Sequence, residues 1–197
     1  MGRHIEIEFK NMVTKEHFEL LLSVFHITRD DFAKQVNHYF DTDTFLLKQK
    51  AAALRIRNRD HLYELTLKKK TETIGLLEIN QEISPAEANA CLHKQMFPEG
   101  EVKAELAAID INPNWLICFG SLETRRAERP FGPGCLQFDH SLYLGREDFE
   151  VEYEIPEGKI DEGKKNFFQL LNELNIPTKK ADNKIKRLYD AKFTYLE

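Results

Sequence analysis

Strict alternation of charged and apolar side chains over several short stretches is the feature that most limits how this chain can fold. Residues Glu6 to Lys10 read charged, apolar, charged, apolar, charged, and the same period recurs at 53–57, 63–68 and 149–155. A period of two is that of a β-strand, whose successive side chains point to opposite faces. The pattern predicts a sheet with one apolar face and one charged face.

The rest of the chain supplies more strands and the helices that cover the apolar face. Besides the stretch at 6–10, strands are predicted at 35–41, 53–57, 63–68, 76–83, 115–129, 136–140 and 149–155. Helices are predicted from Thr14 to about Phe25, from Ser84 to near Met96, and at 101–109, 161–174 and 183–195, with a polar turn at 69–73. Short links and about eight strands indicate a mostly antiparallel sheet in an α+β fold.

Composition limits the classes of function. The chain has 197 residues and a formal net charge of −5, which offers no general attraction to nucleic acid or to an anionic membrane. It shows no signal peptide or membrane-length apolar run, and no repeat or flexible linker, so we expect one domain over 1–197. Three scattered cysteines, Cys91, Cys118 and Cys135, favour a reducing, cytoplasmic setting.

The charged strand faces are where a function is expected. They carry Glu6, Glu8, Lys10, Arg55, Arg57, Lys68, Glu82, Arg125, Asp139, Glu152 and Glu154. On an open sheet such a face meets water and carries no meaning. In a sheet closed into a barrel with helices outside, it would line a polar channel wide enough for one small ligand. Unpaired charges gathered by sign are costly unless a ligand of opposite charge neutralises them.

A polyphosphate with one or two magnesium ions would satisfy both signs of charge. Magnesium prefers carboxylate and water oxygens and bridges to substrate phosphates. Arginine matches phosphate oxygens bidentately, and lysine acts as a point charge.

The order of these motifs resembles that of the CYTH superfamily, the triphosphate tunnel metalloenzymes. The resemblance begins at Glu6–Lys10 with the pattern ExExK and covers nearly the whole chain. It continues through 39–41, 53–57, 65–68, 81–82, 123–125, 138–139, 150–154 and 184–187, and is most like the bacterial branch called YjbK-like. It implies a closed eight-stranded antiparallel tunnel that binds a linear triphosphate.

The resemblance also implies roles for individual residues. Phosphate oxygens would be bound by Lys10, Arg55, Arg57, Lys68, Arg125 and Lys184. Mg²⁺ or Mn²⁺ would be held by Glu6, Glu8, Glu82, Asp139, Glu152 and Glu154. Glu6, Glu8 and Lys10 would be catalytic, and a water activated nearby would attack the terminal phosphorus.

Several alternatives stay open at this point. Glu78 competes with Glu82 as the acid of its strand, Lys186 and Arg187 compete with Lys184, and Arg126 is expected to point outward. The leading function is a metal-dependent hydrolase of tripolyphosphate or of an organic triphosphate such as thiamine triphosphate. An adenylyl cyclase and a non-catalytic polyphosphate or nucleotide receptor are the alternatives. The expected partner is this small molecule, with neither nucleic acid nor membrane; a homodimer is one option.

Overall fold

The computed structural model describes residues 2–71 and 75–193. They form two compact units. Unit 1 comprises the residues up to Ile5 together with Gln35–Leu122, and unit 2 comprises Glu6–Lys34 together with the residues from Glu123 onward. The predicted single domain therefore stays a prediction. No helix among the described residues is both long enough and apolar enough to cross a membrane.

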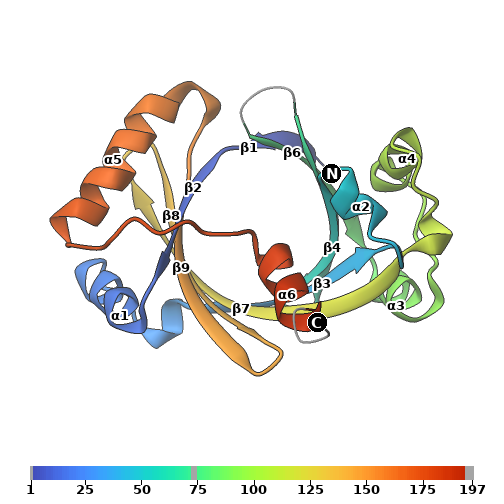
Figure 1. The fold of residues 1–197 in the computed structure, drawn as a ribbon, viewed down its shortest axis with the longest axis horizontal. Helices are drawn as coiled ribbons and strands as arrows, with labels where there is room; N and C mark the ends of the chain where they lie inside the picture. Colours follow the sequence, from blue (N-terminus) through green and yellow to red (C-terminus); the bar gives the residue numbers. More distant parts are fainter. Residues whose placement is uncertain (1, 72–74, 194–197) are drawn as a thin grey trace. The chain divides into compact units, whose positions relative to one another are not determined.

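Among the described residues, nine strands are linked by hydrogen bonds into one sheet. Figure 1 shows the course of these strands. They are β1 (Gly2–Glu6), β2 (Glu8–Val13), β3 (Ala33–Asp41), β4 (Ala52–Arg59), β5 (Leu62–Lys70), β6 (Leu76–Ile83), β7 (Ile117–Phe131), β8 (Gly134–Tyr143) and β9 (Arg146–Glu154). Their order in the sheet is β1-β6-β5-β4-β3-β7-β8-β9-β2. The predicted antiparallel pairing is confirmed within each unit.

The strand count differs from the prediction at the first alternating stretch. One strand was expected across Glu6–Lys10, but the chain leaves β1 at Glu6 and starts β2 at Glu8. Ile7 between them is buried, and its carbonyl accepts a hydrogen bond from the Ile155 amide at 3.0 Å. The break lets β1 pair with β6 while β2 pairs with β9. The charged and apolar residues alternate across the break although the partner strand changes.

The described residues include six helices, of which all but the last cover apolar strand faces, whereas the last lies over charged side chains of β8 and β9 in unit 2. They are α1 (Lys15–Val24), α2 (Leu46–Gln49), α3 (Pro85–Lys94), α4 (Glu101–Ala108), α5 (Ile160–Glu173) and α6 (Lys184–Phe193), with short 3₁₀ turns η1 (Arg29–Asp31), η2 (Pro113–Trp115) and η3 (Glu157–Lys159). The predicted helix 183–195 and turn 69–73 both extend beyond the described residues, at 194–195 and 72–73.

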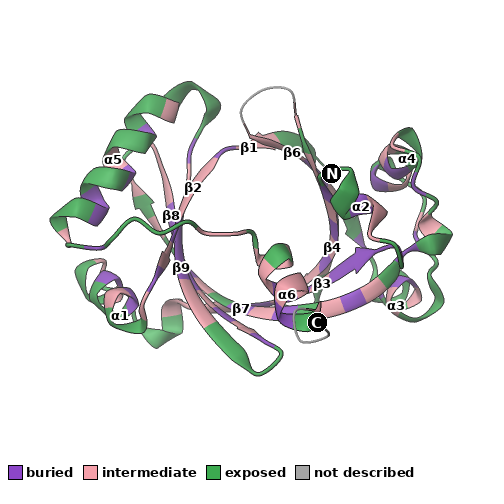
Figure 2. Ribbon diagram, viewed as in Figure 1, coloured by how far each residue is buried: buried purple, intermediate pink, exposed green. Residues whose placement is uncertain are grey.

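In unit 1, α3 and α4 pack on the apolar side of β5 and β6. Leu54, Leu65, Ile79 and Leu106 are fully buried in its core. The predicted capping box at the start of α3 is confirmed: Ser84 accepts from the Glu87 amide, and the Glu87 carboxylate accepts from the Ser84 amide. In Figure 2 the buried residues (purple) lie mainly on the strands and on the helix sides that face them. The exposed residues (green) lie mainly on the outer sides of the helices.

In unit 2, α5 and α1 cover the apolar side of the strands around β9. Phe167 of α5 stacks on Tyr153 of β9, with ring centroids 6.0 Å apart, and lies 6.2 Å from Phe9 of β2. Both Phe167 and Tyr153 are fully buried. The apolar faces of β2 and β9 are thereby used for packing, which leaves their charged faces on the opposite side.

Helix α2, which follows β3 after a short turn, is not predicted from the sequence. Asp41 is buried and accepts hydrogen bonds from the amides of Thr42, Leu47 and Lys48 at 2.8–3.1 Å. Burial raises the pKa of this carboxyl group, although the amides that donate to it oppose the rise. Asp41 thus fixes the entry into α2 and serves the backbone.

Candidate active site

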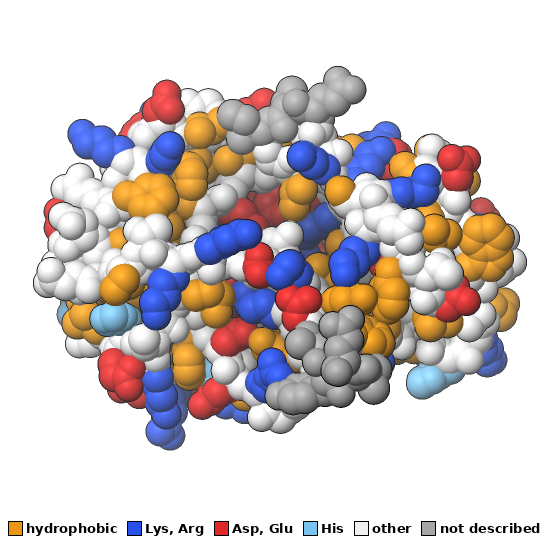
Figure 3. All heavy atoms as spheres, viewed as in Figure 1, with side chains coloured by type: hydrophobic (Ala, Val, Ile, Leu, Met, Phe, Trp, Pro, Cys, Tyr) orange, Lys and Arg blue, Asp and Glu red, His pale blue; other side chains and the backbone are white. Residues whose placement is uncertain are grey.

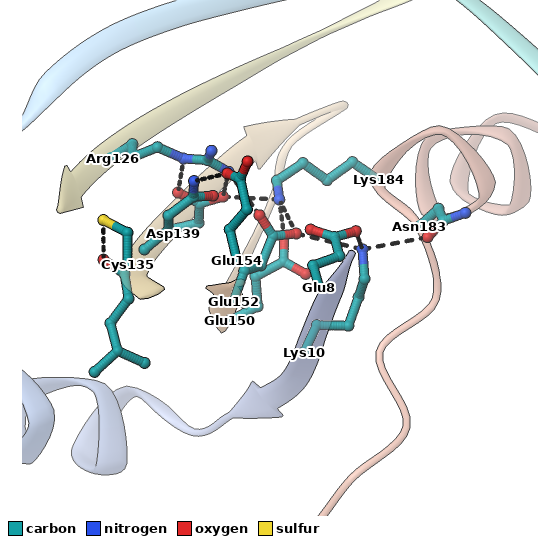
Figure 4. Close-up of polar contacts among 12 residues, drawn as sticks. Glu8, Lys10, Arg126, Cys135, Asp139, Glu150, Glu152, Glu154, Asn183 and Lys184 are labelled. Carbon is teal, nitrogen blue, oxygen red and sulfur yellow. Dashed lines mark hydrogen bonds and ion pairs between the residues drawn. The ribbon is translucent and has the colours of Figure 1, made fainter. Parts of the chain in front are cut away.

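Hairpin registers bring ionisable side chains of unit 2 into rows across the charged face. Arg126 of β7 lies opposite Asp139 of β8, and Asp139 lies opposite Glu150 of β9. In the adjoining strand pair, Lys10 of β2 lies opposite Glu152 of β9. Figure 4 shows these side chains converging on one another from β2, β7, β8, β9 and α6.

Arg126 is the guanidinium group at the centre of this face. Its Nε and Nη2 atoms donate to the two carboxylate oxygens of Asp139 at 2.7 and 2.5 Å, and Nη2 also reaches Glu152 at 2.7 Å. The side chain of Asp139 is fully buried. Burial opposes ionisation of Asp139, but Arg126 and Lys184 outweigh that effect and hold its pKa below the usual value.

Lys184, the first residue of α6, neutralises most of the remaining negative charge. Its Nζ lies 2.8 Å from Asp139 and 3.0 Å from Glu152, and it also contacts Glu150. Burial opposes the positive charge of Lys184, yet these carboxylates raise its pKa above the usual value. Burial likewise opposes the charge of Glu152, but Lys184, Lys10 and Arg126 hold its pKa well below the usual value.

Lys10 extends the cluster along β2. Its Nζ contacts Glu8, lies 3.5 Å from Glu152, and donates to Asn183 Oδ1 at 3.3 Å. Burial lowers the pKa of Lys10, but Glu152 and Glu8 more than compensate, so the group stays charged. Lys10 therefore links the acidic strands to the residue that precedes α6.

Arg187 adds a cation to which the sequence analysis gave no role of its own. It binds Glu150 with both Nη atoms at 2.9 and 3.0 Å, and its Nε lies 3.0 Å from Asp148. Lys184 and Arg187 sit one turn apart on α6, so both reach the strands, whereas Lys186 pairs with Asp182 and Asp190 at the surface. On the face seen in Figure 3, side chains of both charges lie side by side over α6.

Three carboxylates of this cluster form a donor set that fits a divalent cation. One oxygen each from Asp139, Glu150 and Glu152 lies within 4.8 Å of the others, and all three residues are buried. Oxygen donors of this kind suit Mg²⁺ or Mn²⁺. Lys184 contacts all three carboxylates, so a bound cation would compete with its ammonium group.

Unit 1 carries a second charged cluster, in which cations dominate. Glu78 of β6 is buried and lies 3.2 Å from Arg55, 3.5 Å from Lys68 and 3.4 Å from His4. Burial opposes ionisation of Glu78, but Lys68 and Arg55 lower its pKa. The buried Nε of Arg55 has no hydrogen-bond acceptor among the described residues. This donor is available to an anionic ligand.

Comparison with known proteins identifies the family. The model of the CYTH domain matches residues 4–189, nearly the whole chain. The chain belongs to the CYTH family. Within it, the chain is 45% identical to YjbK of Bacillus subtilis (strain 168), a candidate triphosphatase, with 98% of both chains covered.

Solved structures place the CYTH chain in the same fold. A Bacillus halodurans protein described as a candidate adenylate cyclase superimposes with a TM-score of 0.91 at 42% identity, covering 96% of this chain and all of that one. HpAC1 from Hippeastrum superimposes with a TM-score of 0.78 at 22% identity, covering 94% of this chain and 96% of that one. The predicted family and fold class are confirmed, with nine strands in place of eight.

Two predicted positions of the CYTH site are corrected by the structure. Arg125 was expected in the site, with Arg126 pointing outward, and the structure reverses them. The side chain of Arg125 is 54% exposed and lies 3.3 Å from Glu123, whereas that of Arg126 is 13% exposed and binds Asp139. Arg126 lies on the charged face because it pairs with Asp139 of β8, whereas Arg125 pairs with His140 on the other face.

The second correction concerns β6. Glu82 was expected to be the acid of this strand, but it is exposed and lies opposite Glu64. Glu78 lies opposite Lys68 and makes the ion pairs described above. The charge of the neighbouring strand therefore decides between the two acids.

The remaining predicted strand residues lie on the strands expected of them, except that Glu6 falls on β1 and Glu8 on β2 instead of on one strand. Glu154 is half-buried and accepts a hydrogen bond from Gln137 at 3.0 Å, Arg57 donates to Asn37 at 3.3 Å, and Glu8 pairs with Lys10. Glu6 is half-buried at the end of β1. Glu150, which had been left out, belongs to the carboxylate cluster.

Proposed function

We propose that this CYTH protein is a divalent-metal-dependent triphosphatase that removes the terminal phosphate of a linear triphosphate. The observation that carries the proposal is the buried cluster of Asp139, Glu150 and Glu152 beside Lys10 and Lys184. Phosphoryl transfer needs positioning and neutralisation of charge more than covalent help from the protein. A cluster that offers carboxylate oxygens and ammonium groups together suits that task, and its relative YjbK is a candidate triphosphatase.

Each group of residues has a proposed part in the reaction. Asp139, Glu150 and Glu152 hold the cation, with Glu6, Glu8 and Glu154 as further carboxylates of the same chain. The bound cation, Mg²⁺ or Mn²⁺, neutralises phosphate charge and lowers the pKa of a bound water. Lys10 and Lys184 bind phosphate oxygens, and Arg126 keeps Asp139 ionised and oriented.

Arg55, Arg57 and Lys68 of unit 1 are proposed to bind phosphate oxygens as well. The Nε of Arg55 has no acceptor within residues 2–71 and 75–193, and this supports the role, because a buried donor without an acceptor is costly until an oxyanion satisfies it. Glu78 holds Arg55 and Lys68 in place while the ligand is absent. We propose that the substrate is inorganic tripolyphosphate or an organic triphosphate such as thiamine triphosphate.

Phosphate release from tripolyphosphate, thiamine triphosphate and ATP tests the proposal, with Mg²⁺, Mn²⁺ or EDTA present. We expect metal-dependent release that Glu152→Gln and Arg57→Ala each reduce at least about a hundredfold. Glu157→Gln makes the same chemical change at an exposed position and should leave the rate unchanged. Equal circular dichroism spectra and melting curves would show that Glu152→Gln still folds.

Other outcomes of this assay would contradict the proposal. Cyclic AMP formed from ATP would assign the chain to adenylyl cyclases, the class suggested for its Bacillus halodurans relative. Triphosphate binding that needs Arg57, without turnover under any of these metal conditions, would indicate a receptor. Release that is insensitive to EDTA would refute metal dependence.

A further inference from the structure

Unit 2 has a pocket on the sheet face opposite to the one that carries the carboxylate cluster. This pocket has no part in the function proposed above. Its volume is about 450 Å³, and residues of α1, η1, β7, β8 and β9 line it. This size lies within the range of small-molecule sites. Arg125, which the structure removes from the candidate active site, is one of the lining residues.

Aromatic rings form one wall of this outer pocket. Phe18 lies 5.0 Å from Phe149 and 6.3 Å from Phe32, measured between ring centroids. His140 stacks on Phe149 at 4.6 Å with an interplanar angle of 17°. Phe32, His140 and Phe149 are only half-buried. Flat faces of this kind suit a planar ligand.

The rim of the outer pocket carries more positive than negative charge. Lys15, Arg29 and Arg125 are exposed there, and the acids among the described lining residues are Glu19 and Glu147. Outside the lining, Glu123 lies 3.3 Å from Arg125 in an exposed ion pair, which a bound phosphate would have to displace. Glu147 is already engaged by His140 Nε2 at 2.8 Å. A guanidinium group beside aromatic rings matches a phosphate attached to a planar base.

We propose that the outer pocket binds a nucleoside monophosphate, with the base against the aromatic wall and the phosphate at Arg125 and Arg29. The same strands carry the pocket and the candidate active site on their two faces. Arg125, His140 and Phe149 form one register row, and Arg126, Asp139 and Glu150 form the next row on the opposite face. The ligand is therefore separated from the carboxylate cluster by the thickness of one sheet.

Binding of AMP to the purified full chain in EDTA, followed by calorimetry, tests the proposal. We expect one site, with adenosine and inorganic phosphate each binding at least about tenfold more weakly, because each lacks one half of the recognised chemistry. Arg125→Glu and Arg29→Glu should each weaken AMP at least about tenfold. Lys165→Glu makes the same change of charge type on exposed α5 and should leave the affinity unchanged.

Equal AMP affinity in wild type and Arg125→Glu would overturn the proposal, as would no binding at millimolar AMP. A titration of tripolyphosphate separates the outer pocket from the candidate active site. Competition by tripolyphosphate that Arg57→Ala abolishes would place AMP in the candidate active site and overturn the proposal, whereas no competition, or competition that Arg57→Ala leaves unchanged, is expected of the outer pocket. The Arg125 comparison needs no triphosphate binding, so it stands even if the proposed function fails.

Discussion

Arg125 and Arg126 are neighbours of the same type in opposite environments, which makes them a matched pair for mutation. Arg126→Gln leaves Asp139 and Glu152 with less compensation in a buried setting and should destabilise the protein by about 3–5 kcal/mol. Arg125→Gln loses one exposed ion pair and should change stability by less than about 0.5 kcal/mol. Urea unfolding of both variants measures the difference. Similar losses would contradict the assignment of faces.

Glu78 and Glu82 form a second matched pair, on β6. Glu78→Gln removes the carboxylate that holds Arg55 and Lys68, so we expect a higher KM for triphosphate and some loss of stability. Glu82→Gln alters an exposed side chain and should leave both unchanged. Steady-state kinetics with tripolyphosphate, together with melting curves, checks this. A larger effect at Glu82 would restore the original assignment.

The residue-level errors have identifiable causes. The turn at Gly132-Pro133 pairs Phe131 with Gly134, and counting back from it places Arg126 opposite Asp139. The position of this turn in the sequence was therefore enough to predict that Arg126, and not Arg125, lies opposite Asp139. The choice between Glu78 and Glu82 had no such signal, because both side chains lie on the same face of β6 and only the pairing with β5 sets Lys68 opposite Glu78 and Glu64 opposite Glu82.

At the scale of elements, Asp31 stabilises the 3₁₀ turn η1. Its carboxylate accepts from the amide and hydroxyl of Thr28 at 2.7 and 2.8 Å and pairs with Arg129 at 2.7 Å. These contacts lower its pKa to about 2. The stabilisation is therefore complete above the unfolded-state pKa near 4 and is lost as the pH falls towards 2.

We expect the urea midpoint of the wild type to fall more steeply between pH 4 and pH 2 than that of Asp31→Asn. Above pH 5 the variant should be the less stable protein, and near pH 2 the two midpoints should converge. Asp161→Asn, at an exposed position in the first turn of α5, serves as the control. A difference between the urea midpoints of wild type and Asp31→Asn that stays constant with pH would show that the charge of Asp31 does not contribute to stability.

The segment between α5 and α6 depends on one buried amide. Asn11 donates to the Pro177 carbonyl at 3.1 Å and accepts from the Lys179 amide at 2.6 Å. Asn11→Ala should therefore speed hydrogen exchange of the Lys179 amide at least about tenfold, while Asn172→Ala on exposed α5 should not. Unchanged exchange would mean that the pairing of Met12 with Lys179 holds the segment unaided.

Across the whole molecule, the sequence predicted the α+β class and most elements because alternation and capping are local signals. The limits of β6 at 76–83 and the start of α1 after Thr14 were obtained directly. The change of partner at Ile7 was not, because β1 and β2 read as one uninterrupted pattern. The division into two units was also not visible in the composition, because the boundaries fall inside strand patterns, between Ile5 and Glu6 and between Leu122 and Glu123.

Ligand binding should be visible in the stability of the whole chain. A ligand that binds only the folded protein stabilises it by about 2.7 kcal/mol at a hundred times its Kd. We expect Mn²⁺ with a non-hydrolysable triphosphate analogue to raise the Tm, and EDTA to reverse the rise. Lys184→Gln removes the ammonium group that competes for the three carboxylates, so Mn²⁺ alone should shift its Tm more than that of the wild type. Lys186→Gln removes the same charge from the exposed side of α6, where Lys186 pairs with Asp182, and this variant should respond like the wild type. An equal response from the Lys184 and Lys186 variants would show that the cation does not bind at this cluster.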